Sequence, residues 1–462
     1  MDAYLLLDFG STYTKLTAVD IENEEILATA KDITTIEDDI MTGFDKAYEK
    51  LSKQLEGKEV NFVKKLACSS AAGGLKMIAI GLVPDLTAEA AKRAALGAGA
   101  RILNVYSYEL SKREIEEIKN SNLDIILLAG GTDGGNKDCI IHNANMLAKY
   151  NINLPIVVAG NKAAADTVSE ILTEANIFHT VTENVMPKLN ALNVEPAREE
   201  IRQIFMKRIV EAKGMSNAED FINGILMPTP AAVLKAARVL SEGTDTEDGI
   251  GDLIVVDIGG ATTDIHSLAD GDPTKSGVTM RGLEEPFAKR TVEGDLGMRY
   301  SAVSLFEAAG TRKLQKYLQD KSINLQESCQ FRVNNIRMIP ETEEDIKFDE
   351  AMAKVATDIA MERHSGYVES VYTPVGVVYT QIGKDLLQVK TVIGTGGVLV
   401  HSKNPGEILK AGALDVENPV YLKPQDPGFY IDKTYILSSM GLLAEDHPEK
   451  AIRIMKKYLV RV

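Results

Sequence analysis

The sequence DFGSTYTK at residues 8–15 joins a carboxylate, a glycine and a run of hydroxyls at the end of an apolar strand, and the same order returns later in the chain. The second copy is DIGGATTD at residues 257–264. Glycine permits a tight reversal in which backbone N–H groups and hydroxyls can face a phosphate. Mg²⁺ is usually held by one or two carboxylates together with substrate phosphates. The repeated pattern therefore predicts nucleotide binding at two equivalent turns, with Lys15 either bonding a phosphate or neutralising the nearby carboxylates.

Two further glycine-rich turns follow predicted strands. The turn IGTGGVL at residues 393–399 could let a flat base or ribose lie against bare backbone. The turn GGTDGG at residues 130–135 places Asp133 at the carboxyl end of a predicted sheet, where α/β folds bind ligands. Asp133 is the candidate for orienting an attacking water, although GGTDGG is equally consistent with a tight loop. No Walker A motif and no GxGxxG motif after a first strand is present.

The pattern around the first turn predicts three strands at residues 4–7, 13–19 and 25–30, which form a β-meander. Strand-like and helical runs then alternate, which is typical of an α/β fold. After the acidic run 242–251 the meander returns, with its third strand expected near 277–281. The predicted organisation is a first lobe at 1–250 with a helical segment at 196–241, a second lobe at 251–432, and C-terminal helices at 433–462.

Composition restricts the function further. The chain has 462 residues, which suggests two or three domains. Its 51 basic and 67 acidic side chains give a net charge of −16, so nucleic acid and anionic membranes are poor partners. No apolar run is long enough to span a membrane and no secretory signal precedes the first strand, so we expect a cytoplasmic protein. The three cysteines show no CxxC pairing, so we expect reduced, mostly buried thiols.

The sequence DIHSLA at residues 264–269 comes close to DxHxxG, a cobalamin-binding signature in which the histidine ligates cobalt. Ala269 replaces the required glycine, and the segment leaves the preceding turn as a strand. We therefore predict that His266 is a buried strand histidine and not a cobalt ligand.

Three motifs resemble those of the actin, DnaK-type chaperone and sugar-kinase superfamily: DFGSTYTK and VVDIGGATTD resemble its phosphate motifs, and IGTGGVLV resembles its adenosine motif. LLAGGTDGG, TVEGDLG and IGKDL more closely resemble the MutL family encoded beside glutamate mutase, also called GlmL, which is unrelated to the mismatch-repair protein. The stretches of family-like sequence cover most of the chain.

The resemblance implies two RNase H-like lobes that flank a nucleotide cleft, with the final helices packing back toward the first lobe. It implies that Asp8 and Asp257 hold Mg²⁺ and that glycines 394, 396 and 397 meet the adenosine of ATP. The residues implied to line the phosphates are Gly10, Ser11, Thr12, Gly259, Gly260, Thr262 and Thr263. The implied role is an accessory ATPase for an adenosylcobalamin-dependent mutase or aminomutase, which helps to replace damaged cofactor, with lobe closure controlling contact with the mutase.

Two other functions remain open at this stage. A small-molecule kinase of the same fold would need a general base beside a substrate hydroxyl, and Asp133 could be that base. A filament-forming actin relative is supported by nothing beyond the fold.

Overall fold

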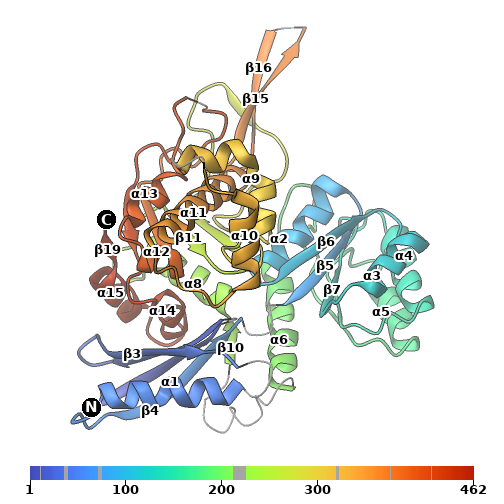
Figure 1. The fold of residues 1–462 in the computed structure, drawn as a ribbon. Helices are drawn as coiled ribbons and strands as arrows, with labels where there is room; N and C mark the ends of the chain where they lie inside the picture. The colour runs from blue at the N-terminus through green and yellow to red at the C-terminus, as the bar shows by residue number, and fades with distance from the viewer. Residues whose placement is uncertain are drawn as a thin grey trace. The chain divides into compact units, whose positions relative to one another are not determined.

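The computed structural model describes residues 1–10, 12–35, 40–70, 75–211, 225–318, 322–374, 376–417 and 419–462. These residues form two compact units, the first made of Met1–Ala232 with Gly282–Glu284 and the second of Val233–Arg281 with Glu285–Val462 (Figure 1). Both units combine helices with sheets, so the predicted α/β class is confirmed. None of the helices within the described ranges has the length and hydropathy needed to cross a bilayer.

The first sheet of the first unit contains the predicted meander. Its strands are β1 (Asp2–Phe9), β2 (Tyr13–Asp20), β3 (Glu25–Ile33), β4 (Asn61–Ser69) and β10 (Ile225–Pro228), in the order β10-β4-β1-β2-β3. β1, β2 and β3 run antiparallel, whereas β4 is parallel to both β1 and β10. Helix α1 (Ile40–Gln54) covers one face, because Phe44, Ala47 and Leu51 repeat at helical spacing and pack against Leu5 and Leu7.

A second sheet of the first unit is parallel throughout. Its strands are β5 (Lys76–Gly81), β6 (Arg101–Ser107), β7 (Ile125–Leu128), β8 (Ile156–Val158) and β9 (His179–Val181), in the order β6-β5-β7-β8-β9. The π-helical turn η2 (Pro84–Ala88), α2 (Glu89–Gly97) and α6 (Glu195–Glu211) pack on one face. Helices α3 (Lys112–Asn120), α4 (Asp138–Lys149) and α5 (Ala165–Glu174) pack on the other. This is the doubly wound order 2-1-3-4-5.

The main sheet of the second unit repeats the first one. Its strands are β11 (Leu253–Ile258), β12 (Thr263–Leu268), β14 (Ala288–Glu293), β17 (Thr391–Thr395), β18 (Gly428–Ile431) and β19 (Val460–Arg461), in the order β14-β12-β11-β17-β18-β19. An antiparallel meander again continues into two parallel strands beside the first strand of the meander. The predicted repeat and the RNase H-like type of both sheets are therefore confirmed.

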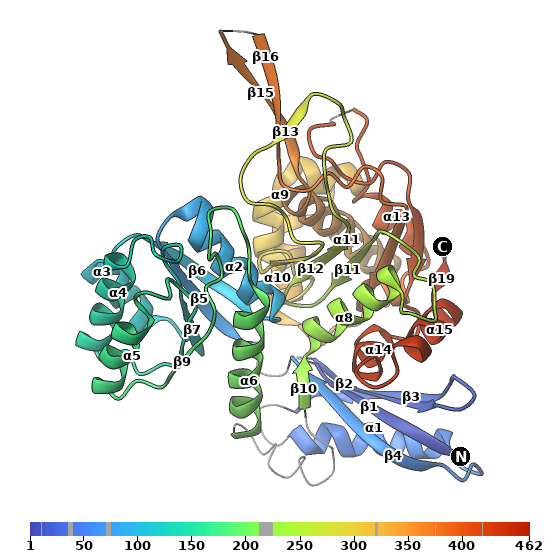
Figure 2. The ribbon, with the colours of Figure 1, turned by 180° about the vertical axis from the view of Figure 1, so that it is seen from behind.

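The third strand of the second meander was predicted in the wrong place. The segment predicted near 277–281 contains β13 (Val278–Met280), which pairs with β16 (Gly376–Ile382) in a separate sheet completed by β15 (Tyr367–Thr373) (Figure 2). β14 takes the third place, because its Ala288 and Arg290 are buried whereas the β13 residues are mostly exposed. The predicted helical segment 196–241 also contains a strand, β10, between α6 and α8 (Thr229–Glu242).

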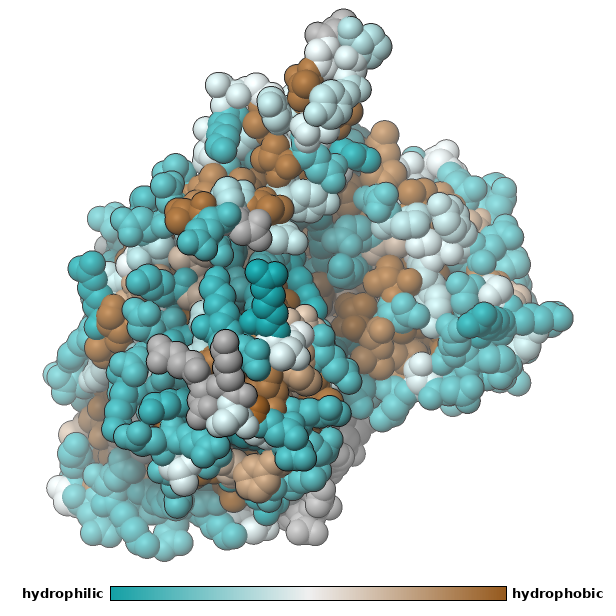
Figure 3. Space-filling model, turned by 45° about the horizontal axis from the view of Figure 1, so that its top comes forward, coloured by the Kyte–Doolittle hydropathy of each residue, from teal (hydrophilic) through white to brown (hydrophobic). Residues whose placement is uncertain are grey.

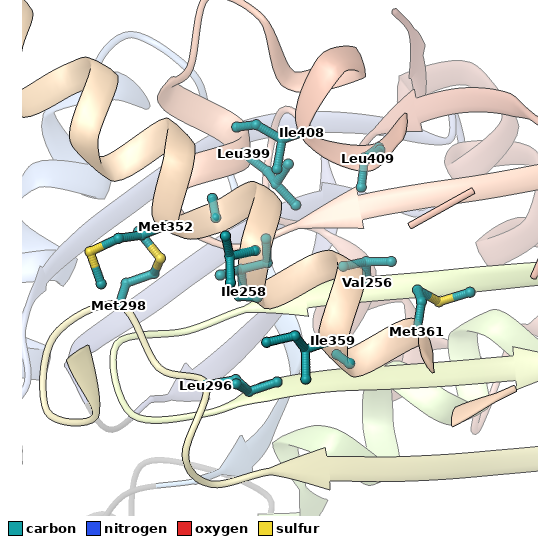
Figure 4. Packing of buried hydrophobic residues seen from close by; sticks show 14 of the residues in the cluster. Val256, Ile258, Leu296, Met298, Met352, Ile359, Met361, Leu399, Ile408 and Leu409 are labelled. Carbon is teal, nitrogen blue, oxygen red and sulfur yellow. The ribbon is translucent and has the colours of Figure 1, made fainter. Parts of the chain in front are cut away.

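The core of the second unit lies around α11 (Glu343–His364), which is buried along most of its length. Figure 4 shows Met352 of α11 beside Met298, and Ile359 of α11 next to Leu296, in the cluster that also contains Val256 and Ile258 of β11. The surrounding helices are α9 (Ala302–Tyr317), α10 (Leu325–Asn334), α12 (Gly397–His401) and α13 (Pro405–Lys410). The last helices, α14 (Leu437–Leu443) and α15 (Pro448–Tyr458), pack on each other.

Candidate functional site

The two predicted phosphate turns have the same backbone structure. Gly10 N donates to Tyr13 O at 3.1 Å, and Gly259 N donates to Thr262 O at 2.9 Å. A Cβ atom on Gly10 would lie 2.6 Å from Tyr13 O, and one on Gly259 would lie 3.0 Å from Thr262 O. A side chain is therefore excluded at Gly10, and at the equivalent Gly259 it would force a shift of a few tenths of an ångström.

Asp8 lies at the end of β1 and is only 2% exposed. Its Oδ1 accepts a 2.6 Å hydrogen bond from Thr229 Oγ1, and its Oδ2 lies 3.4 Å from Lys15 Nζ. Lys15 therefore neutralises the Asp8 carboxylate, which is one of the two roles predicted for it; the other is to bond a phosphate. Because β1 and β4 are parallel and in register, Cys68 lies next to Asp8, and its thiol donates to Oδ1 at 3.7 Å. Burial, followed by the charge of Asp8, raises the pKa of the Cys68 thiol well above its ordinary value.

Neighbouring segments hold the first turn by its carbonyl groups. The carbonyl oxygen of Phe9 accepts from Ser70 N at 2.9 Å, and that of Thr12 accepts from Thr34 N at 2.9 Å. Ser11, a predicted phosphate ligand, lies outside the described residues. Gly10 and Thr12 thus lie on a turn that is anchored from two sides.

The second turn rests on residues 294–301, which we call the strap. Three consecutive strap amides, those of residues 298–300, donate to the carbonyl oxygens of Gly259 and Gly260 at 2.8–3.0 Å. Ser301 Oγ lies 2.8 Å from the carbonyl oxygen of Ala261. A Cβ atom on Gly297 would lie 2.3 Å from the Ala261 carbonyl carbon, so strap and turn touch backbone to backbone.

The contact between the strap and the second turn uses the carbonyl groups of the turn and leaves its N–H groups available to bind a ligand. The strap engages the carbonyl groups of Gly259, Gly260 and Ala261, whereas the N–H groups of Gly260, Ala261 and Thr262 have no acceptor among the described residues. All three residues are partly exposed. Successive free N–H groups on one tight turn form a concave site for an anion. The geometry therefore suits a phosphate oxygen at this turn.

The two threonine hydroxyls of the second turn that were predicted to line the phosphates are engaged within the protein. Thr263 is fully buried, and its hydroxyl donates to the carbonyl oxygen of Leu296 at 2.7 Å. The Thr262 hydroxyl donates to Asp264 Oδ2 at 2.9 Å. At the second turn, the backbone amides are thus the free donors.

Asp257 is partly buried at the end of β11, and the residue opposite it in the ladder is a second carboxylate, Asp264. Arg290 neutralises Asp264, because its Nε and Nη2 both donate to Oδ1, at 2.9 and 2.5 Å. Both residues of this ion pair are buried. Arg290 therefore binds the carboxylate opposite Asp257, whereas Lys15 contacts the strand-end carboxylate Asp8 itself.

The predicted adenosine turn follows β17, which lies parallel to β11 with Thr395 opposite Asp257. Gly396 has a φ of 99°, and a Cβ atom there would lie 2.3 Å from Ile258 O. Gly397 is exposed and has room for a side chain, since only Tyr435 Oη lies near its Cβ position, at 3.6 Å. Gly396 and Gly397 thus lie at the same sheet edge as the second phosphate turn.

Gly394 has a different environment from the two later glycines. It is buried, and a Cβ atom there would lie 2.9–3.0 Å from the side chains of Ile431, Leu399 and Leu409. Its lack of a side chain is explained by apolar packing in the core.

Asp133 lies on the loop after β7, at the carboxyl end of the parallel sheet, which is a different sheet from the one that carries Asp8. Its Oδ1 accepts from Lys162 N and from Asn184 Nδ2, each at 3.0 Å. Its own amide donates to Pro187 O at 3.0 Å. These bonds connect the Asp133 loop with the segments around Lys162 and around residues 184–187. Such contacts are consistent with the alternative that GGTDGG is a tight structural loop.

His266 lies in β12 and is 1% exposed, in agreement with the predicted buried strand histidine. Burial, assisted by the charge of Arg290, lowers the pKa of its imidazole to about 3. Its Nδ1 has no hydrogen-bond partner among the described residues. Nor do those residues contain a cluster of three or more His, Cys, Asp or Glu side chains with metal-ligand geometry.

Comparison with known proteins gives matches over the full length. A protein-family profile described as MutL protein matches residues 4–459. Protein MutL of Clostridium tetanomorphum is 81% identical over 462 residues, covering 100% of both chains.

Solved structures match at much lower similarity. The activator of the 2-hydroxyisocaproyl-CoA dehydratase from Clostridium difficile with bound ADPNP is 9% identical, covers 98% of this chain and 97% of its own, and has a TM-score of 0.33. The gluconate kinase from Lactobacillus acidophilus is 11% identical, covers 100% and 92%, and has a TM-score of 0.34.

Proposed function

The chain belongs to the MutL protein family, and from this membership we propose that it is an ATP-binding accessory factor for an adenosylcobalamin-dependent mutase. The observation that carries the nucleotide part of the proposal is the second turn. Its carbonyl groups are engaged by the strap, and three successive N–H groups are left for a phosphate.

Each unit contributes one strand-end carboxylate of the kind that Mg²⁺ prefers. We propose that Asp8 and Asp257 would hold Mg²⁺, which when bound would neutralise phosphate charge. The amides of residues 260–262 would bind phosphate oxygens, and the bare backbone at Gly396 and Gly397 would lie against the adenosine. The contacts of Asp133 give no support to the kinase alternative, since its Oδ1 already accepts two hydrogen bonds within the loops.

We infer that the nucleotide state controls contact with the mutase, through closure of the two lobes. ATP can shift a conformational equilibrium only by its differential affinity for the two forms. A coupling free energy of about 1–3 kcal/mol would change the affinity for the mutase by roughly 5- to 150-fold.

The test is reactivation of glutamate mutase that carries an inactive cobalamin. We expect the protein to restore mutase activity only when ATP, Mg²⁺ and fresh adenosylcobalamin are all present. ATP with Mg²⁺ should also raise the melting temperature, since a ligand at a hundredfold excess over its Kd stabilises the folded state by about 2.7 kcal/mol. Reactivation that proceeds equally without nucleotide would contradict the proposal.

The variants Asp8→Asn and Asp257→Asn keep the side-chain shape and remove the charge. Each should lower the ATP hydrolysis rate at least about tenfold, which is about 1.4 kcal/mol in the barrier. Asp272→Asn, at an exposed position of the second unit, is the matched control and should hydrolyse ATP at the normal rate. Full activity of either site variant would remove that carboxylate from the site.

A further inference from the structure

Strands β15 and β16 form a hairpin that stands out from the rest of the second unit; we call these two strands, residues 367–373 and 376–382, the arm (Figure 1). No charged residue occurs from Ser370 to Gly383, although 26% of the chain is charged. Figure 3 shows the arm in white, pale and brown shades where the surrounding surface is largely teal. Its exposed large side chains are Val371, Tyr372, Val377, Val378 and Tyr379. Exposed apolar clusters of this kind mark interaction sites.

The exposed side chains occupy both faces of the arm. Tyr372 pairs with Val377 and Ser370 with Tyr379, so these residues share one face of the ribbon. Val371 pairs with Val378 on the other face. A flat surface or the arm of a second copy could cover only one face or one edge at a time, whereas a groove that receives the ribbon covers both.

The root of the arm is firmly anchored. Gln381 is buried, and its Nε2 donates to the carbonyl oxygens of Gly271 and Gly383 at 2.8 Å. Lys384 follows directly and is also buried, with Nζ donating to Ala269 O at 2.5 Å and to Phe287 O at 2.7 Å. The exposed tip therefore extends from a fixed base.

The arm also continues directly from α11, which holds the strap. Arg363, in the last turn of α11, donates to Asp295 at 2.7 and 2.9 Å and to Glu293 at 2.6 Å. Near the start of α11, Asp349 accepts from Arg299 of the strap at 2.7 Å. These two attachments are 363 − 349 = 14 residues apart, or about 21 Å at 1.5 Å per helical residue. One helix thus joins the root of the arm to the segment that supports the second phosphate turn.

We propose that the arm is the element that docks the mutase, by insertion into an uncharged, apolar groove of that protein, and that α11 couples docking to the nucleotide through Arg363. This inference rests on the proposed function. The partner groove must lack charge, because a charge buried against the arm would have no counter-charge over residues 370–383. Tyrosines at the centre of such a contact supply large rigid side chains, which are frequent binding hot spots. Arg363 is in this view a positioning residue for the strap.

The first test measures the affinity for glutamate mutase that carries hydroxocobalamin, with ATP, with ADP and without nucleotide. We expect Tyr372→Glu and Val378→Glu, one on each face of the arm, to weaken mutase binding at least tenfold and to leave the Kd for ATP unchanged. Both positions are exposed, so the fold should be retained. The control is Leu189→Glu, at a position of the first unit that is 67% exposed, which should bind the mutase normally.

The second test concerns the coupling. Arg363→Gln should bring the mutase affinities measured with ATP and with ADP closer together, and Arg363→Lys, which keeps a cation, should restore part of the difference. An Arg363→Gln variant that retains the full ratio would overturn the coupling.

The possible results distinguish a failure of the arm proposal from a failure of the proposed function. If the wild-type protein binds the mutase in a nucleotide-dependent manner and both arm variants bind equally well, the arm proposal is wrong and the proposed function stands. If the wild type binds in no nucleotide state, both fail. If the arm variants convert a dimer to a monomer in sedimentation and do not affect mutase affinity, the arm contacts a second copy and the proposal is overturned.

Discussion

The two buried histidines of the second unit should make this protein sensitive to mild acid. His266 lies in β12 with its pKa lowered to about 3, chiefly by burial. Burial and the charge of Lys289 also lower the pKa of His364 well below its ordinary value. The two nitrogens of His364 lie 2.8 Å from the hydroxyls of Ser267 and Thr291, so its ring is fixed in the fold.

The sign of the effect follows from proton binding. The unfolded chain protonates these histidines as the pH falls through about 6.5, while the folded protein keeps both neutral. The unfolded state then binds more protons, so the stabilisation present above pH 6.5 is lost progressively at lower pH. Between pH 7.5 and pH 5.5 the two histidines together should lower the free energy of unfolding by about 3 kcal/mol, about half of it from each.

Urea denaturation followed by far-UV circular dichroism measures this loss; the chain has no Trp, so indole fluorescence is not an option. The variant His266→Leu removes one titrating group, together with a buried Nδ1 that has no partner among the described residues, and should remove about half of the pH dependence. His401→Gln, at an exposed position, is the control and should leave the pH dependence unchanged. Equal dependence in the wild type and His266→Leu would refute the assignment of the effect to His266.

Two substitutions test the turns themselves. Gly396→Ala should destabilise the second unit by about 2–4 kcal/mol and weaken ATP binding in a titration, because φ is positive and the new Cβ would meet Ile258 O at 2.3 Å. Gly406→Ala in α13 is the control and should be tolerated, because its Cβ would make only ordinary contacts, at 3.6 Å or more. Thr229→Val should lower the free energy of unfolding by about 1.5–3 kcal/mol in urea, because it removes the 2.6 Å hydrogen bond to the buried carboxylate of Asp8; an unchanged midpoint would mean that this bond contributes nothing.

The amino-acid sequence predicted correctly those parts of the fold whose determining residues lie within a few positions of one another. The turns at 8–15 and 257–264 carry their glycines and carboxylates within a few residues, and the strands beside them alternate or are wholly apolar. Because both meanders show the same local pattern, the duplication is recognisable from the amino-acid sequence alone. The position of Asp133 at the carboxyl end of a sheet followed from the same kind of signal.

Features that depend on distant partners could not be predicted. β13 comes first in the chain after β12, and only the pairing of β14 with β12 decides that β14 completes the meander. Thr229 is 221 residues from Asp8, and no local pattern indicates that its hydroxyl reaches that carboxylate. The strap contacts the second turn mainly through backbone amides. Every residue type except proline has such an amide, so the sequence does not indicate this contact. Gly297, where a side chain would collide with the Ala261 backbone, was the one visible sign of this close contact.

Two lysines lie near the carboxylate of the first turn. Lys15 lies opposite Asp8 in the ladder, and Lys31 of β3 lies opposite Lys15. Burial and the charge of Lys15 lower the pKa of Lys31, which is the expected result of placing two cations side by side. Two amines beside this turn favour the approach of phosphate oxygens.

At the second turn the ion pair involves the other carboxylate of the hairpin, since Arg290 binds Asp264, which lies opposite Asp257 in the ladder. A carboxylate beside a phosphate repels it, so such a turn binds a phosphate well only when a cation accompanies it. The two hairpins thus share a backbone but should differ in their need for the metal. A Mg²⁺ titration of ATP hydrolysis tests this difference: Asp257→Asn should raise the Mg²⁺ concentration needed for half-maximal rate more than Asp8→Asn does. An equal shift in both variants would mean that Asp8 and Asp257 contribute equally to the Mg²⁺ requirement, which would refute the predicted difference between the two turns.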